Sequence, residues 1–427
     1  MTRSFFRGSM RRFEKAKQLP KTRKRPMARL DVEATVEAIG ASLTQRTPIL
    51  EELSGQVRAA VLQDWIPRLP CLRSLDPWDG SSLADTGSLI SSHCRSFESL
   101  GFYSWVSSDA DEVFSRFLLD LRSHTLKSLE IYSRAQISAK TFAALNNHSE
   151  SLAELKIGAL EPEAIPFLSI LKPCTHLTTL SFSEIYSGTV DLETDHPESL
   201  SNLTAWVANC KNLRSLSVTK FKNSGPLLVP VLLGQDISLE HLEVSGYSLK
   251  HSAAFHESLG NQTSLKTLTL KGDDDDATLR QETYDMLARS VCLLKELTYL
   301  NLRSSSDTFS DHDLISIAMT HPKLETWWTG GTFITDKVLK PIASMRQLKR
   351  LECSAMTRFS RKGLEEFFNT LQMPGNEGFN FAVNAPDASD EYDIFPEDEE
   401  YIRNLAKSRV NGNIEFPGLY SSVSTCF

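Results

Sequence analysis

The chain has 427 residues, of which 41% are hydrophobic and 23% are charged, and its formal net charge is −8 at pH 7. This composition is ordinary for a soluble folded protein, and the length allows either two or three compact domains or one elongated array of repeats. The longest apolar run, Leu227–Leu233, is much shorter than the roughly 20 residues that a membrane-spanning helix needs, so we expect no membrane segment.

The chain begins with a basic arm, residues 1–30, for which we expect no stable structure. Residues 1–29 hold eleven Lys and Arg against one acid, Glu14, so the rest of the chain is strongly acidic. Charges interrupt the arm too often for a secretory signal. The arm, with its basic stretch Lys21–Arg25, fits a nuclear-localisation signal, a transit peptide or a tail that carries no targeting signal. Three phenylalanines alone do not make a base-stacking platform, so we do not expect nucleic acid as a partner.

Residues 31–70 follow the arm and are predicted to form an N-terminal helical cap. Apolar residues recur at helical spacing around 32–39 and again around 57–65, as they do on an amphipathic helix.

A hexad of the form L-x-x-L-x-L then recurs eleven times. The start-to-start spacings are 25, 29, 26, 25, 36, 26, 26, 32, 27 and 24 residues, and the first and tenth hexads are degenerate at their last apolar position. The hexads begin at Leu72, Phe97, Leu126, Leu152, Leu177, Leu213, Leu239, Leu265, Leu297, Leu324 and Leu348. A period of 24–29 residues is typical of leucine-rich repeats.

Each hexad has the pattern of a half-buried strand. Apolar positions four and six alternate with polar positions three and five, which is the two-residue period of a strand with one face in the core. Between hexads, an apolar residue and a Ser or Thr precede apolar residues at helical spacing, as in Ile334-Thr335-Asp336 before Leu339 and Ile342. The Ser or Thr fits a helix N-cap, and Asp in the first turn suits the helix dipole.

These units predict an α/β leucine-rich-repeat solenoid of about eleven repeats, with a curved parallel sheet inside and helices outside. No single unit buries its own apolar face, so stability must come from stacking neighbours. We therefore expect the solenoid to span residues 71–370, followed by an acidic C-terminal cap and tail over 371–427. Residues 399–410 are expected to form a short helix within that last segment. The two long spacings mark insertions near residues 183–199 and 271–282, and the second contains Asp273–Asp276.

The cysteines fall at regular places in the repeats. Cys94, Cys174 and Cys210 each lie three residues before a hexad, and Cys353 ends the last one. This position favours small buried core residues over metal ligands or catalytic thiols. The seven cysteines never come closer than 23 residues, so the chain has no C-x-x-C motif of a zinc or redox site.

Units that read I-[ST]-D-x-x-L-x-x-I-A and lead into C-x-x-L-x-x-L-x-L resemble the cysteine-containing, RNI-like repeats of F-box/leucine-rich-repeat proteins, of the type common in fungi. The resemblance covers about residues 71–370. It implies a solenoid that recognises the substrate of a cullin-RING ubiquitin ligase, while an N-terminal F-box docks on the ligase adaptor. Residues 1–70 contain no match to the opening L-P-x-E-[IL]-L of an F-box.

Three functions therefore remain open. The first is a ligase substrate receptor, and the second is a stand-alone scaffold or adaptor, with a cytoplasmic or nuclear location in either case. The third is a GTPase-activating repeat protein, whose units typically continue the hexad as L-x-L-x-x-N, an asparagine ladder that this chain lacks.

We expect a protein partner on the concave sheet, at hexad positions three, five and seven. Aromatic residues and arginine dominate the energetics of protein interfaces. The candidate contact residues in the first three units are Trp78, Tyr103 and Tyr132, and those in the later units are Tyr299, Asn301, Arg303, Trp328 and Arg350. The alternative is structural: Trp78 would pack under the N-terminal helices and Trp328 against the end of the array.

No motif of enzyme chemistry is present. The sequence has no phosphate loop, no G-x-G-x-x-G, no H-E-x-x-H and no G-x-S-x-G, and nothing in it brings a Ser, His and Asp together. We therefore expect a non-enzymatic protein with no cofactor and no metal.

Overall fold

The computed structural model describes residues 29–32, 50–186, 188–249, 252–273, 281–354, 357–383 and 396–416. Residues 1–28 of the basic arm, residues 33–49, the run 274–280, residues 384–395 and residues 417–427 lie outside the described residues, so the expectations for them are not tested. No helix in the described ranges has the length and apolar character needed to cross a membrane.

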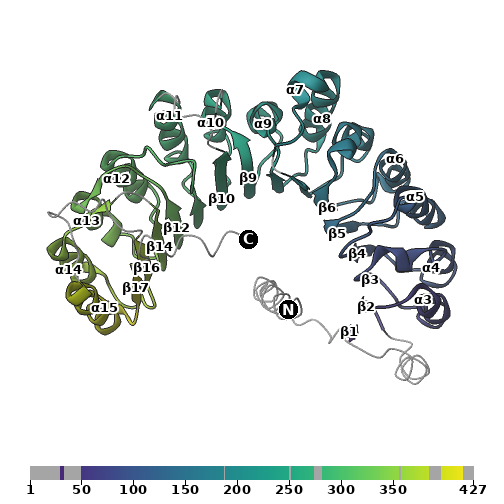
Figure 1. The fold of residues 1–427 in the computed structure, drawn as a ribbon, viewed down its shortest axis with the longest axis horizontal. Helices are drawn as coiled ribbons and strands as arrows, with labels where there is room; N and C mark the ends of the chain where they lie inside the picture. Colours follow the sequence, from purple (N-terminus) through teal and green to yellow (C-terminus); the bar gives the residue numbers. More distant parts are fainter. Residues whose placement is uncertain are drawn as a thin grey trace.

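The described chain is built on one curved sheet of fifteen strands, which lines the inner side of an arc (Figure 1). Every strand pairs in parallel with the next one along the chain, so the order within the sheet follows the sequence without crossovers. The strands are β1 (Arg29–Val32), β2 (Glu52–Gly55), β3 (Ser74–Pro77), β4 (Ser99–Phe102), β5 (Ser128–Arg134), β6 (Glu154–Leu160), β7 (Thr179–Glu184), β8 (Ser215–Thr219), β9 (His241–Ser248), β10 (Thr267–Asp273), β11 (Tyr299–Asn301), β12 (Thr326–Thr329), β14 (Arg350–Cys353), β16 (Asn380–Val383) and β17 (Asn413–Glu415). A separate two-stranded sheet joins β13 (Ile334–Thr335) to β15 (Thr357–Arg358).

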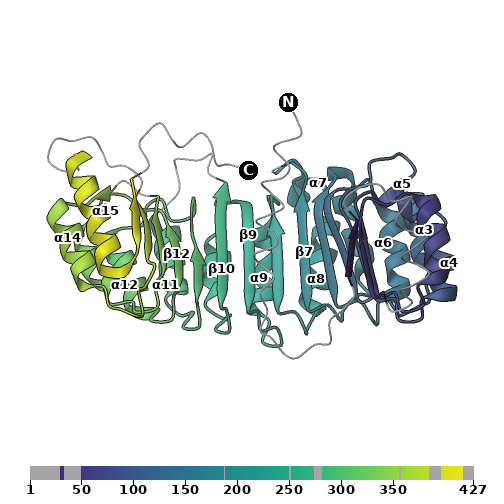
Figure 2. The same ribbon diagram turned by 90° about the horizontal axis from the view of Figure 1, so that it is seen from below.

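Helices cover the outer, convex side of the arc (Figure 1). The α-helices are α3 (Ala59–Trp65), α4 (Gly87–His93), α5 (Ala110–Asp120), α6 (Ala139–Leu145), α7 (Leu192–Asp195), α8 (Pro197–Asn209), α9 (Ser224–Leu233), α10 (Ala253–Leu259), α11 (Gln281–Val291), α12 (Asp311–Thr320), α13 (Leu339–Ala343), α14 (Arg361–Thr370) and α15 (Pro396–Val410). Short 3₁₀ segments take a helix's place or extend one, the longest being η4 (Pro162–Leu171). Figure 2 shows the strands standing side by side across the sheet. The predicted leucine-rich-repeat solenoid is confirmed.

The core between sheet and helices is a continuous stack of side chains from the fourth hexad position. The strand register aligns Leu75 with Leu100, and the same alignment continues from strand to strand to Ile414. All eleven predicted hexads form strands of the sheet, namely β3 to β12 and β14. In the tenth hexad Trp327 takes the place of leucine and is fully buried. Burying a large apolar side chain stabilises the fold by about 1.5–3 kcal/mol, so the stack is the main source of stability.

The sheet extends beyond the range 71–370 at both ends. Strand β2 lies in the stretch for which we predicted a helical cap, with α3 following it, and it pairs in register with β3. Leu50 and Leu53 occupy hexad positions one and four there, but Gly55 replaces the last apolar residue, which hides the hexad from a search for leucines. Strands β16 and β17 continue the stack with Phe381 and Ile414 in place of leucine.

Neighbouring repeats are joined by an aspartate in the first turn of a helix. Asp336 accepts hydrogen bonds from the backbone N–H of Ser360, at 2.8 Å, and from its hydroxyl, at 2.6 Å. Asp311 makes the same two contacts with Thr335, at 2.8 and 2.6 Å. The aspartate of the I-[ST]-D pattern, which we expected to interact favourably with the helix dipole, also binds the N-cap residue of the next repeat.

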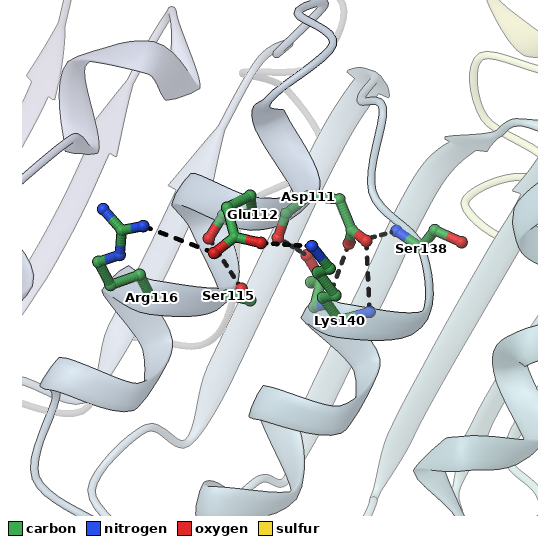
Figure 3. Close-up of polar contacts among 7 residues, drawn as sticks. Asp111, Glu112, Ser115, Arg116, Ser138 and Lys140 are labelled. Atoms are coloured by element: carbon green, nitrogen blue, oxygen red, sulfur yellow. Dashed lines mark hydrogen bonds and ion pairs between the residues drawn. The ribbon is translucent and has the colours of Figure 1, made fainter.

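Figure 3 shows the same joint between α5 and α6. Asp111 accepts from the backbone N–H groups of Ser138, at 2.7 Å, and Thr141, at 3.0 Å. Next to it, Lys140 forms an ion pair with Glu112 across the two helices. Hydrogen bonds to a charged acceptor contribute more than neutral ones, so each joint adds to the apolar stacking of adjacent units.

The first insertion and the C-terminal segment both belong to the array. The insertion near residues 183–199 holds the short helix α7 and the start of α8. The helix expected over residues 399–410 is α15, which begins at Pro396 and buries Ile402, Ala406 and Val410 against the last repeat.

Candidate functional site

The concave face consists of the side chains at hexad positions three, five and seven. On β3 the residues alternate between partly exposed and buried, from Ser74 to Pro77, and β12 and β14 alternate in the same sense. Because a strand points successive side chains to opposite faces, the leucines occupy the core and the intervening residues line the inner side of the arc. Seven of the eight candidate contact residues are exposed or partly exposed on this side, and the eighth, Asn301, is buried.

Three aromatic side chains stand out on neighbouring strands near one end of the arc. Trp78 is 48% exposed, and Tyr103 and Tyr132 are each 43% exposed. Trp78 and Tyr103 directly follow β3 and β4, and Tyr132 lies within β5; all three share one hexad position, which places them in a row. Trp78 therefore keeps a large part of its surface exposed on this face.

Tyr132 is held in place by an acid two strands away. Its hydroxyl donates a hydrogen bond of 3.3 Å to the carboxylate of Asp76 on β3. The intervening strand β4 carries Gly101, where a Cβ would lie 2.9 Å from Asp76 Oδ1 and 3.3 Å from Tyr132 Cε2. The absence of a side chain at Gly101 thus leaves room for the tyrosine and the aspartate to meet across the strand.

Acidic side chains surround this aromatic row. Positions three, five and seven of the strands β2 to β6 include one basic residue, Lys156, which lies 3.5 Å from Glu130. The acids at these positions are Glu52, Asp76, Glu130 and Glu154. We name the three aromatic residues and these four acids the N-terminal patch. The sequence pattern had identified the positions, but attention to aromatic residues alone missed the acids between them.

A second group of side chains lies on β11, β12 and β14. The guanidinium of Arg303 stacks over the ring of Trp328, with its carbon 4.3 Å from the ring centroid, and forms an ion pair with Glu352. The ring of Tyr299 meets Trp328 edge-on, with centroids 5.7 Å apart. We name Tyr299, Arg303, Trp328, Arg350 and Glu352 the C-terminal cluster. Trp328 lies within the sheet rather than against the end of the array, because three more strands follow β12.

The remaining two candidates differ in exposure. Arg350 is exposed at the start of β14, beside Thr326 of β12. Asn301 is only 1% exposed, and its side-chain oxygen accepts a hydrogen bond of 3.2 Å from the backbone N–H of Arg303. Asn301 therefore supports the turn that carries Arg303 and has almost no surface of its own to offer a partner.

Tyr299 is the residue of the C-terminal cluster whose pKa is shifted. Burial raises the pKa of Tyr299, while its hydrogen bond with Asn301 and the charge of Arg303 act in the opposite direction. The phenol is thus a neutral hydroxyl at neutral pH and is available as a hydrogen-bond donor or acceptor.

Cysteines and histidines of the repeats are buried inside the array, among them Cys94, Cys174, Cys210, Cys353, His148 and His321. Burial raises the pKa of Cys94 to about 11 and that of Cys174 and Cys210 to about 12. These thiols stay protonated at neutral pH, whereas nucleophilic and metal-bound cysteines are thiolates. The two ring nitrogens of His321 lie within hydrogen-bond distance of backbone carbonyl oxygens, Nδ1 at 2.9 Å from that of Ile317 and Nε2 at 3.0 Å from that of Val291. In the described ranges, no group of three or more His, Cys, Asp or Glu is arranged to hold a metal ion.

Comparisons with known proteins return only structural likeness. No family model matches the sequence, and no curated protein sequence matches it. Among solved structures, an internalin from Listeria monocytogenes aligns with a TM-score of 0.43 and 13% identity over 75% of this chain and 88% of its own. Rad7 in complex with Elc1 from yeast aligns with a TM-score of 0.47 and 12% identity, over 84% of this chain and 85% of its own. TLR13 in complex with ssRNA13 aligns with a TM-score of 0.38 and 11% identity, over 90% of this chain. This chain spans 64% of the TLR13 chain.

Proposed function

We propose that this leucine-rich-repeat solenoid binds another protein on its concave face. The observation that carries the proposal is the exposure of Trp78, Tyr103 and Tyr132 in one row on a rigid sheet. Folding normally removes large aromatic surfaces from water, and exposed aromatic groups rimmed by polar residues mark interaction sites. Aromatic side chains and arginine also supply most of the binding energy in measured interfaces.

The C-terminal cluster is a second contact area for the same partner. Arg303 is positioned on both sides, by the Trp328 ring beneath it and by the Glu352 carboxylate beside it. A side chain held in this way loses little conformational freedom on binding, and preorganisation of this kind favours affinity. Asn301 contributes by fixing the turn that carries Arg303 rather than by touching the partner.

The test is affinity capture with the full chain, followed by quantitative mass spectrometry. Trp78→Ala, Tyr103→Ala and Trp328→Ala are each compared with the wild-type protein. A protein whose recovery falls at least tenfold with a concave variant is the expected partner, since an anchor residue contributes about 2 kcal/mol or more.

Matched controls come from the convex side. Met319 on α12 is 74% exposed and Leu119 on α5 is 60% exposed, so their change to Ala removes a comparable apolar surface from the other face. Equal recovery of every partner with concave and convex variants, at unchanged thermal stability, would contradict the proposal.

We further propose that the partner is the substrate of a cullin-RING ubiquitin ligase, and that the chain acts in the cytoplasm or the nucleus. The support is the resemblance of the repeats to the RNI-like units of F-box/leucine-rich-repeat proteins of the fungal type. The buried Cys94, Cys174 and Cys210, each at the step from helix to strand, fit that resemblance. Co-purification of the ligase adaptor with the full chain is the expected result, and mapping the 5′ end of the transcript tests for an upstream F-box.

Capture of a partner without any ligase adaptor would instead favour a stand-alone scaffold or adaptor. Stimulated GTP hydrolysis by a captured GTPase would favour the third possibility, a GTPase-activating repeat protein. In each of these cases, the variants on the concave face still test whether this face is the binding surface.

A further inference from the structure

We propose that the N-terminal patch is the docking site of the chain's own basic arm, residues 1–28. The inference concerns an intramolecular contact and does not depend on which partner the solenoid binds. It is carried by three features: the charge of the patch, the chemistry of its aromatic side chains, and the strand to which the arm is attached.

The first feature is charge complementarity. The patch brings four carboxylates, Glu52, Asp76, Glu130 and Glu154, onto neighbouring strands, and the basic residue among them, Lys156, is already paired with Glu130 at 3.5 Å. The ladder positions align Glu52 with Ser74 and Glu154 with Ser128, so the acids share one face of the sheet. The arm before β1 carries ten Lys and Arg and a single acid, Glu14.

The second feature is the aromatic row between the acids. Trp78, Tyr103 and Tyr132 leave large parts of their rings uncovered. Cations bind over the faces of such rings, with a gain of about 0.5–1 kcal/mol at exposed sites. A surface that combines carboxylates with exposed aromatic rings is therefore selective for Arg and Lys over other residues.

The third feature is reach. The arm joins the sheet at Arg29, the first residue of β1, which pairs with β2 next to the patch. Four strand spacings separate β1 from β5, which is roughly 19 Å at ~4.8 Å per spacing. Lys21 lies eight residues before Arg29, a length that spans roughly 26 Å when extended. The basic residues Lys21, Arg23 and Lys24 can therefore reach Asp76 and Glu130 without help from the rest of the arm.

The acids of α15 are worse placed for this contact. Glu397, Glu399 and Glu400 lie in α15, which packs at the opposite end of the arc from β1 (Figure 1). The strands β1 and β16 are thirteen spacings apart along the sheet, roughly 62 Å, which exceeds the reach of Lys21. Because tethering makes the local concentration of the arm high, on the order of millimolar, even a weak contact with the nearer patch would be occupied.

The consequence is a competition for the concave face. A partner that uses Trp78, Tyr103 and Tyr132 must displace the arm, so the arm would act as a built-in competitor whose strength falls as salt screens the charges. A phosphate group or a negatively charged partner that binds the arm would release the patch.

The first experiment is zero-length carbodiimide cross-linking of the full chain, with peptide mapping by mass spectrometry. Links from Lys21 or Lys24 to Asp76 or Glu130 are expected, and they should become several-fold weaker at high salt. A mixture of ¹⁵N-labelled and unlabelled chains distinguishes the source of each link. Links of mixed isotope composition would place the arm on a second copy, and links only to Glu397–Glu400 would place it elsewhere; either result overturns the proposal.

The second experiment measures the rate of tryptic cleavage after Lys21, Arg23 and Lys24. The triple variant Asp76→Asn/Glu130→Gln/Glu154→Gln should be cleaved several-fold faster than the wild-type chain. The control Glu150→Gln/Glu163→Gln/Glu198→Gln changes the net charge equally at exposed positions off the concave strands. Equal cleavage rates in all three proteins, or equal acceleration in both variants at unchanged melting temperature, would overturn the proposal.

Discussion

The guanidinium carbon of Arg303 lies 4.3 Å from the centroid of the Trp328 ring, so that one side chain shields the other on the concave face. The contact joins two neighbouring repeats, and it covers the tryptophan without placing it in the core. The neighbouring Trp327 points to the other side of the same strand and is fully buried.

Arg303→Ala should uncover Trp328. Trp65, Trp105, Trp206 and Trp327 are buried and Trp78 is already exposed, so an increase in the fraction of tryptophan fluorescence that acrylamide quenches can be assigned to Trp328. Arg350→Ala, which removes an exposed arginine from the same face, is the matched control. An unchanged quenchable fraction in Arg303→Ala would show that the stacking does not persist in solution.

The two adjacent tryptophans should differ sharply in their effect on stability. Trp327→Ala removes a fully buried side chain from the central stack, and we expect it to lower the free energy of unfolding by about 3–5 kcal/mol. Trp328→Ala removes a partly exposed ring, so its cost should be about 1 kcal/mol or less. Chemical denaturation of both variants measures the difference, and equal costs would mean that the assignment of the two faces of β12 is wrong.

The aspartate joint between repeats predicts a loss of stability in Asp336→Ala. The change removes two hydrogen bonds, at 2.8 and 2.6 Å, and leaves the Ser360 N–H without its acceptor, so about 1–3 kcal/mol of stability should be lost. Ser360→Ala removes the hydroxyl contact with Asp336 and also the cap hydrogen bond of 3.0 Å from Gly363 N–H. In the Asp336→Ala background it should therefore cost less than in the wild-type chain, because the shared contact is already broken. Fully additive costs in this double-mutant cycle would show that the joint is not a unit.

Gly363 tests the same joint from the opposite side. A Cβ at this position would lie 2.2 Å from the carboxyl carbon of Asp336, so Gly363→Ala should push the aspartate away from Ser360 and lower the melting temperature. In the Asp336→Ala background the space is free, and Gly363→Ala should then be neutral or stabilising, as Ala favours a helix by roughly 1 kcal/mol over Gly. Destabilisation of similar size in both backgrounds would refute this explanation.

Glu184 should make stability depend on pH. Burial raises its pKa from about 4.5 to about 7, although backbone N–H groups of Thr189 and Val190 act against the shift. The pKa in the folded chain is thus above its unfolded value, so the stabilising contribution is complete below about pH 4.5 and is lost as the pH rises through 7.

Glu184→Gln removes this titration. Its free energy of unfolding, relative to that of the wild-type chain, should therefore increase by about 1–3 kcal/mol as the pH is raised from about 5 to about 8. Denaturation midpoints at the two pH values measure the gain. Glu193→Gln, at an exposed position of the same insertion, is the matched control for the loss of a carboxylate. A constant difference between Glu184→Gln and wild type across this range would exclude a raised pKa.

The sequence alone determined the repeat, the parallel order of the strands and the inner position of the leucines. These features follow from local spacing, because a strand alternates its faces and a repeat stacks on its neighbour. It also located the exposed aromatic row, since Trp78, Tyr103 and Tyr132 share one hexad position. The strands β2, β16 and β17 were missed because Gly55, Phe381 and Ile414 replace the leucines that mark a hexad.

Only the tertiary structure decided how residues of different repeats meet. The contact between Tyr132 and Asp76 spans 56 residues and depends on the missing side chain of Gly101. The burial of Asn301, the stacking of Arg303 on Trp328 and the joint between Asp336 and Ser360 likewise depend on neighbouring units. Periodicity places a residue on a face, but the contacts across that face depend on the sizes and charges of side chains two or more strands apart.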